Sequence, residues 1–300
     1  MACRNVVSTE MKRSVIQTPR GHFAYLEDGP EDGPVVLCLH GFPDHAPSWN
    51  ALLPHLAAQG YRAIAPWLRG YSPSVLEGDF DIDSLTDDIV TLASSFGTQE
   101  KPIRLVGHDW GAVLTWLAAA HHPELFTSAA TLAVPHPLQF FELLLRNPSQ
   151  LGRSGYMGLF QLRSLSDWVV TRDDLSFIDL LWKKWSPGYQ PCPQYMAELK
   201  SCLKESMPGP LNYYRKILRP LVPSIRRLLD PRQPERSIKV PVLSITGAND
   251  GCIVANSKMD SSRFMQAAYQ QIEIPNAGHF MHLEAPDQVN QTISSWFQTH

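Results

Sequence analysis

Cysteine is scarce in this sequence. The chain has five cysteines, an odd number, and none of them falls in a Cys-x-x-Cys spacing. A disulfide framework needs paired cysteines and a structural zinc site needs clustered ligands, so the sequence indicates neither. Such usage fits a protein of the reducing cytoplasm.

Long apolar runs and a strong charge of one sign are missing as well. No stretch approaches eighteen consecutive apolar residues, and residues 1–21 contain basic side chains without the apolar run of a signal peptide. We therefore expect a cytoplasmic protein that does not span a membrane. The formal net charge is -3, so no basic field favours nucleic acid or an anionic membrane as a partner.

Apolar residues are plentiful, at 44% of the chain, which is enough for a large core. Short apolar runs alternate with amphipathic helical stretches, a pattern typical of an α/β protein with a mostly parallel central sheet. Strands are predicted near residues 15–17, 23–26, 35–39, 63–65, 103–106, 128–134, 240–245 and 271–274. Helices are predicted at 48–56, with Ser48 as the cap, at 84–96 and at 112–120.

The strand pattern stops in the middle of the chain. Residues 137–234 contain helical stretches crowded with tryptophan and tyrosine, and no convincing buried strand. We therefore predict a core domain formed by residues 1–136 and 235–300, interrupted by a helical cap domain of residues 137–234.

Gly107-His108-Asp109-Trp110-Gly111 matches the G-x-nucleophile-x-G turn called the nucleophile elbow. A buried strand precedes it and an apolar helix follows it, which is the context the elbow requires. Asp109 stands where serine would normally stand, and this changes the expected chemistry from acyl transfer to alkyl transfer. An aspartate is ordinarily ionised at neutral pH, so it needs no base to attack an electrophilic carbon.

Two further candidates follow later strands. Ligands in open α/β sheets bind outside the carboxyl ends of the strands. Asp250 follows the strand predicted at 240–245, and His279 follows the strand predicted at 271–274. The order nucleophile, acid, histidine is the one associated with α/β-hydrolases. Asn249 or another nearby acid is an alternative to Asp250, and His282 is an alternative to His279.

Nearly the whole chain resembles the α/β-hydrolase fold, and most specifically the epoxide hydrolases of that superfamily. His40-Gly41-Phe42-Pro43 matches their H-G-x-P loop, and Asp109 lies in their aspartate elbow. Members of the family use two lid tyrosines that hydrogen-bond the epoxide oxygen. Tyr156 resembles the first, and Tyr214, in a Gly-Pro-Leu-Asn-Tyr-Tyr-Arg segment, resembles the second.

The resemblance implies a two-step hydrolysis. Asp109 would open the epoxide and form an alkyl ester, while Tyr156 and Tyr214 donate to the epoxide oxygen. His279, oriented by Asp250, would then activate water to hydrolyse that ester.

The same resemblance implies the oxyanion donors and the partners. The backbone N–H groups of Phe42 and Trp110 are the expected donors to the oxyanion, in a loop that also contains His40, Gly41 and Pro43. The implied reactants are a small apolar epoxide and water, with no cofactor and no metal.

Other functions stay open at the level of sequence. Haloalkane and haloacid dehalogenases also use an aspartate elbow, and Trp110 suits a halide-binding role, whereas Phe42 stands where many haloalkane dehalogenases have asparagine. A non-catalytic sensor or carrier of a small ligand is the alternative of another class, because fold alone does not establish activity. A homodimer formed through an exposed surface of the cap is compatible with the sequence.

Overall fold

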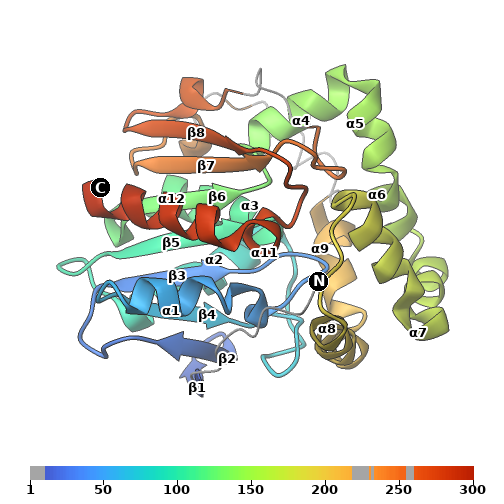
Figure 1. Ribbon diagram of the computed structural model, residues 1–300, viewed down its shortest axis with the longest axis horizontal. Coiled ribbons are helices and arrows are strands. Elements are labelled where there is room, and N and C mark those ends of the chain that lie inside the picture. Colours follow the sequence, from blue (N-terminus) through green and yellow to red (C-terminus); the bar gives the residue numbers. More distant parts are fainter. Residues whose placement is uncertain (1–10, 218–229, 231–232, 255–259) are drawn as a thin grey trace.

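A single mixed sheet forms the centre of the molecule. The computed structural model describes residues 11–217, 230, 233–254 and 260–300 (Figure 1). The eight strands lie in the order β1-β2-β4-β3-β5-β6-β7-β8. The bounds are Lys12–Thr18 for β1, Gly21–Asp28 for β2, Val35–Leu39 for β3, Arg62–Pro66 for β4, Ile103–His108 for β5, Phe126–Leu132 for β6, Val242–Gly247 for β7 and Tyr269–Ile274 for β8.

The sheet is mostly parallel, as predicted. β1 pairs with β2 and β2 with β4 in antiparallel fashion, and every other neighbouring pair is parallel. Every residue of β3 is buried, because helices cover both faces of a parallel sheet and leave no polar side to its strands. All eight predicted strands are confirmed, and so is the α/β class with a mostly parallel central sheet.

Five helices flank the sheet (Figure 1). α1 (Leu52–Ala57), α11 (Met281–Glu284) and α12 (Pro286–Thr299) pack together, while α2 (Ile82–Phe96) packs against α3 (Trp110–His121). α2 begins two residues before the predicted start because the side chain of Asp81 accepts a hydrogen bond from the amide of Ser84 at 2.9 Å.

The prediction that Ser48 caps a helix through residue 56 is wrong. Ser48 lies inside the short 3-10 helix η1, Ala46–Trp49, and α1 starts later. Pro47 explains the difference, because its fixed φ favours the first positions of a helical turn and starts that turn before Ser48.

Six helices of the described residues lie between β6 and β7 along the chain, and we call them the inserted helices. They are α4 (Pro137–Arg146), α5 (Pro148–Arg153), α6 (Gly155–Phe160), α7 (Arg163–Trp185), α8 (Pro193–Ser206) and α9 (Gly209–Ile217). They gather at one end of the sheet (Figure 1). Residues 137–217 contain no strand, as predicted. The division into a core domain and a cap domain of residues 137–234 stays a prediction, and residues 218–229 and 231–232 of that cap lie outside the described residues.

None of the helices in the described residues is both long enough and apolar enough to cross a lipid bilayer.

Candidate active site

Asp109 lies at the sharp turn between β5 and α3. Its backbone has φ 51° and ψ -116°, which is outside the regions that residues other than glycine ordinarily occupy. The two glycines of the motif make the turn possible, because a Cβ atom on Gly107 would lie 2.2 Å from the carbonyl oxygen of Gly111. Asp109 is 5% exposed and is therefore largely shielded from water.

The Asp109 carboxylate has a donor on one oxygen and a histidine near the other. The backbone N–H of Phe42 donates to Oδ1 at 2.8 Å, and Nε2 of His279 lies 3.5 Å from Oδ2. Gly41 leaves room for this approach, since a Cβ atom there would lie 2.6 Å from Oδ1 of Asp109. The H-G-x-P loop thus places the amide of Phe42 on this carboxylate. The roles of the Phe42 and Trp110 amides as oxyanion donors stay predictions.

Asp250 is the acid that contacts His279. Its Oδ2 lies 2.9 Å from Nδ1 of His279, and its Oδ1 accepts the amides of Cys252 and Ile253 at 2.7 and 2.9 Å. A carboxylate at Nδ1 favours the proton on that nitrogen and directs Nε2 toward Asp109. The structure therefore brings together Asp109, Asp250 and His279, as the order of the motifs predicted.

The two alternatives lie elsewhere. The amide of Asn249 donates to the carbonyl oxygen of Ala277, while Asp250 holds the histidine. Nε2 of His282 lies 3.7 Å from a carboxylate oxygen of Asp44. The structure therefore favours Asp250 over Asn249 as the acid, and His279 over His282 as the histidine of the site.

The charge of His279 depends on its two carboxylate neighbours. Burial lowers the pKa of His279, but Asp250 and Asp109 outweigh burial and raise that pKa to about 10. The imidazole is therefore protonated at neutral pH.

Tyr156 comes from α6 and Tyr214 from α9, and the two meet above the elbow. Their ring centroids are 5.5 Å apart, and Tyr214 also packs edge-on against Trp110 and Phe42, at 5.2 and 5.5 Å. Burial raises the pKa of each phenol well above 10, and the charge of Asp109 adds to the shift. Both hydroxyls are therefore protonated and able to donate.

The two hydroxyls differ in what they contact. The Tyr156 hydroxyl lies 3.8 Å from Sγ of Cys252. The Tyr214 hydroxyl is buried and interacts with the side chains of Tyr156 and Trp110.

His40 and Pro43 support the loop rather than the carboxylate. Nε2 of His40 accepts a hydrogen bond from the backbone N–H of Leu68 at 3.1 Å. Nδ1 of His40 lies 3.0 Å from the carbonyl oxygen of Gly41. Burial lowers the pKa of His40 to about 4, so this histidine is neutral at physiological pH. The carbonyl oxygen of Pro43 accepts the indole N–H of Trp182 at 3.1 Å, which ties the loop to α7.

Sequence reasoning missed Trp185 and Cys252. The carbonyl oxygen of Trp185 accepts the amides of Gly251 and His279 at 2.9 and 3.1 Å, so the end of α7 holds both the acid loop and the histidine loop. A bond to a backbone carbonyl has no sequence signature. Cys252 lies two residues after Asp250, and that proximity was the one signal that it borders the site.

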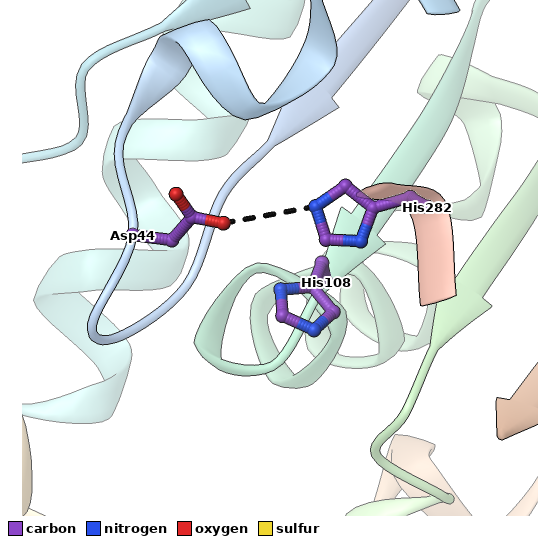
Figure 2. Close-up of side chains that lie close together, drawn as sticks. All are labelled: Asp44, His108 and His282. Atoms are coloured by element: carbon purple, nitrogen blue, oxygen red, sulfur yellow. Dashed lines mark ion pairs between the residues drawn. The ribbon is translucent and has the colours of Figure 1, made fainter. Parts of the chain in front are cut away.

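One group of side chains in the described part of the chain could hold a metal ion. It consists of Asp44, His108 and His282, whose potential ligand atoms lie within 4.8 Å of one another (Figure 2). Asp44 and His108 are not among the predicted site residues, and His282 was predicted only as an alternative to His279.

Comparison with known proteins agrees with the motifs and the fold. The model of the alpha/beta hydrolase family matches residues 36–292. Epoxide hydrolase 3 of Xenopus tropicalis is 30% identical over 287 residues, covering 92% of this chain and 74% of that protein. The AB hydrolase superfamily protein YfhM of Bacillus subtilis is 30% identical over 280 residues, covering 90% and 92%.

A solved structure indicates the same family. The epoxide hydrolase of Bacillus megaterium, crystallised with an inhibitor, superposes with a TM-score of 0.82 at 26% identity, covering 95% of this chain and 100% of that one. The chain therefore belongs to the α/β-hydrolase family, in the branch that contains the epoxide hydrolases.

Proposed function

We propose that this protein is an epoxide hydrolase that converts a small apolar epoxide and water into a vicinal diol. The observation that carries the proposal is the carboxylate of Asp109 at the elbow, with an N–H donor on one oxygen and Nε2 of His279 3.5 Å from the other. A relative that is 30% identical and a solved structure with a TM-score of 0.82 are both named epoxide hydrolases.

In the first step, Asp109 attacks an epoxide carbon. A bond forms between a carboxylate oxygen and that carbon, and the carbon–oxygen bond of the ring breaks. The oxygen that leaves takes a proton from Tyr214 or Tyr156, whose hydroxyls supply the donation that a poor leaving group needs. The product is an alkyl ester on Asp109, a hydroxyl on the neighbouring carbon and a tyrosinate.

Ester formation changes the histidine as well. The ester is neutral, so one of the two negative charges that raise the pKa of His279 is lost. The imidazolium can then return a proton to the tyrosinate and become the neutral base that the second step requires. Formation of the ester therefore leaves His279 in the neutral state that hydrolysis of the ester requires.

In the second step, His279 removes a proton from water and hydroxide adds to the ester carbonyl. The Phe42 amide, and in our proposal the Trp110 amide, stabilise the oxyanion. Collapse of the intermediate expels the diol alkoxide, which takes the proton of the Asp109 carboxyl group. Asp109 is again a carboxylate and His279 again carries a proton, so the cycle balances.

The proposed substrate class follows from the walls of the site. Aromatic rings of Phe42, Trp110, Phe160, Tyr156 and Tyr214 contact one another around the elbow. Such walls favour an apolar substituent, while the two hydroxyls offer donors to a single oxygen. Aryl and alkyl epoxides fit this description.

The test is to trap the ester. His279→Gln protein, wild type and Asp109→Ala are incubated with a panel of epoxides and, separately, of haloalkanes, and their intact masses are measured. We expect His279→Gln to gain the mass of the whole epoxide, and Asp109→Ala to gain nothing.

Other outcomes identify the alternatives. An adduct formed only from haloalkanes, and lighter than the reagent by the hydrogen halide, would make the protein a dehalogenase. A wild type that turns over neither panel, together with an Asp109→Ala variant that still binds the tested compounds, would make it a sensor.

A further inference from the structure

A buried polar cluster lies behind the candidate active site. It consists of Asp44, His108 and His282, whose side chains come from the loop after β3, the end of β5 and α11 (Figure 2). All three residues are at most 3% exposed. Nε2 of His282 lies 3.7 Å from Oδ2 of Asp44, and the rings of His108 and His282 are 4.4 Å apart.

Each member of this cluster is a near neighbour in sequence of one part of the site. Asp44 follows the oxyanion donor Phe42 by two residues, and His108 directly precedes the nucleophile Asp109. His282, in α11, follows the base, His279, by three residues. The three segments that carry Phe42, Asp109 and His279 therefore also contact one another through this cluster.

The charges of the cluster are set by its burial and its contacts. Burial raises the pKa of Asp44, but His282 and His45 outweigh it and keep that pKa well below its usual range. Oδ1 of Asp44 also accepts the amide of His45 at 2.9 Å and the hydroxyl of Tyr195. Asp44 is therefore a fixed negative charge, held by the core and by α8.

His108 connects the cluster to the base. Burial and the neighbouring histidines keep the pKa of His108 well below 6.5, so its ring is neutral. Its Nε2 lies 2.9 Å from the carbonyl oxygen of His279, which fixes the proton on Nε2 as the donor. Nδ1 is then an acceptor, and it has no partner among the described residues.

We propose that Asp44, His108 and His282 are positioning residues that brace the three loops carrying Phe42, Asp109 and His279. The contact of Asp44 with His282 joins the first loop to the third, and the bond from His108 to the His279 carbonyl joins the second to the third. Buried polar contacts of this kind are costly to disrupt and select one arrangement of the elements they join. The inference rests on the proposed function, because it assigns the brace to one step of that reaction.

The brace serves the hydrolysis step. His279 as base and the Phe42 amide as oxyanion donor act on the ester, whereas the attack of Asp109 on the epoxide needs neither. Loosening the brace should slow hydrolysis and leave ester formation unchanged. When hydrolysis limits turnover, the ester accumulates, so kcat and KM fall by the same factor and kcat/KM is preserved.

The first test is the split between kcat and KM. Asp44→Asn and His282→Gln remove one partner each with little change of shape. His136→Gln is the matched control, because His136 is equally buried but stacks on Phe264 outside the cluster. We expect kcat and KM of both cluster variants to fall together by about tenfold, with ester visible in the steady-state mass spectrum and no such change in the control.

Two results would contradict the proposal that Asp44, His108 and His282 position the loops for ester hydrolysis. A lower kcat at constant KM, in proportion to inactive protein, would indicate loss of folded enzyme alone. A lower kcat/KM would place the effect in ester formation. A wild type without epoxide turnover would refute the proposed function rather than the brace.

Hydrogen exchange tests the brace without substrate. We expect Asp44→Asn to speed amide exchange in all three segments, 40–45, 107–111 and 278–283, and His136→Gln to leave them unchanged. Faster exchange confined to 40–45 would overturn the proposal. Metal analysis of the same wild-type protein adds a separate outcome, because one bound zinc per chain that His282→Gln loses would make the cluster a metal site instead.

Discussion

Two histidines of the site show how residue type alone does not determine charge. Burial lowers the pKa of both His40 and His279. His40 lies among backbone groups and stays neutral, whereas the carboxylates of Asp250 and Asp109 raise the pKa of His279 to about 10. The same side chain is therefore a neutral support in one loop and a proton carrier in another.

Removing the Tyr214 hydroxyl tests the donor side of the site. Tyr214→Phe keeps the ring that packs on Trp110 and Phe42 but deletes the buried hydroxyl. We expect the rate of ester formation to fall by about a hundredfold, the effect of losing one donor to a developing oxyanion, while hydrolysis of the ester is unchanged. Rapid-quench mass spectrometry in a His279→Gln background measures the first step.

Tyr25→Phe is the matched control, since Tyr25 lies on β2 away from the elbow. An unchanged rate of ester formation in both Tyr214→Phe and Tyr156→Phe would remove the tyrosines from the mechanism. An effect on hydrolysis alone would assign them a different role.

The residues predicted from the sequence are those that short motifs mark. Asp109 lies between its two glycines, and Asp250 and His279 each follow a strand, so their roles could be proposed from spacing. Trp185 acts through its backbone carbonyl. Asp44 and His282 meet only after folding, and no local pattern joins residues so far apart in the chain.

At the scale of elements, burial explains which predictions succeeded. β3 and β5 are short apolar runs and were found from composition, because a parallel strand covered on both faces has no polar side. The start of α1 was misplaced, because a local cap signal at Ser48 competed with a proline one residue earlier. The helical character of the inserted helices was predicted, but their packing was not, since composition does not say that α6 and α9 meet over the elbow.

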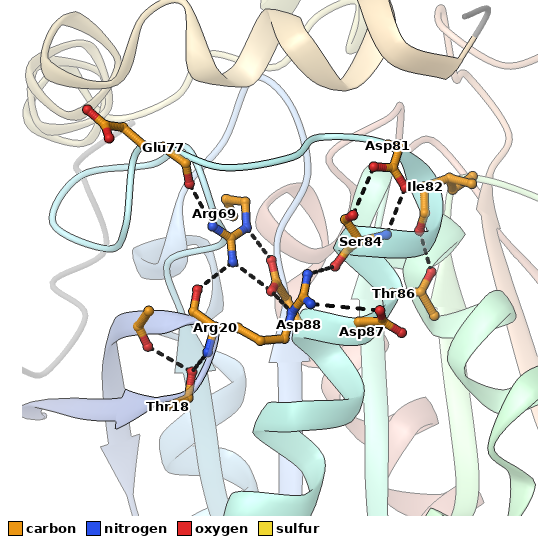
Figure 3. A network of polar contacts seen from close by, with 11 residues as sticks. Thr18, Arg20, Arg69, Glu77, Asp81, Ile82, Ser84, Thr86, Asp87 and Asp88 are labelled. Atoms are coloured by element: carbon orange, nitrogen blue, oxygen red, sulfur yellow. Dashed lines mark hydrogen bonds and ion pairs between the residues drawn. The ribbon is translucent and has the colours of Figure 1, made fainter. Parts of the chain in front are cut away.

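A network of ion pairs holds the loop after β4 against α2 (Figure 3). Asp88 on α2 binds the guanidinium of Arg69 at 2.6 and 2.8 Å and that of Arg20 at 2.5 Å. The carbonyl oxygen of Arg69 accepts the hydroxyl of Tyr213 at 2.7 Å, and Tyr213 directly precedes Tyr214. The network therefore connects α2 to the middle of α9.

Asp88→Asn should destabilise the protein by about 3 kcal/mol, because it leaves the buried Arg69 charge without its partner. The measurement is the midpoint of urea unfolding at unchanged slope. Asp87→Asn is the matched control, since Asp87 is the neighbouring residue with a 60% exposed side chain that lies 3.8 Å from Arg20. A loss equal to that of the control would show that the network adds no stability.

At the scale of the whole molecule, the site depends on segments from the N-terminal and C-terminal parts of the chain and on the inserted helices. Trp185 holds the acid and histidine loops, Trp182 holds Pro43, and Tyr195 reaches Asp44. The geometry of the site is therefore a property of the complete fold. Its charges should in turn affect the stability of that fold.

The pH dependence of stability is the measurable consequence. The pKa of His279 is about 10 in the folded protein and near 6.5 in an unfolded chain. Because the folded state binds this proton more tightly, the stabilisation is present in full below pH 6.5 and is lost as pH rises toward 10. The difference in unfolding free energy between wild type and His279→Gln should therefore shrink steadily from pH 7 to pH 10.

His136→Gln provides a control of opposite sign. Burial lowers the pKa of His136 to about 3, so its effect on stability changes only between pH 3 and 6.5. Above pH 7 the difference between wild type and this variant should be constant. A difference for His279→Gln that is equally constant from pH 7 to pH 10 would mean that His279 is already neutral in the free protein. The proton transfer from His279 to the tyrosinate would then have to be replaced by one from water.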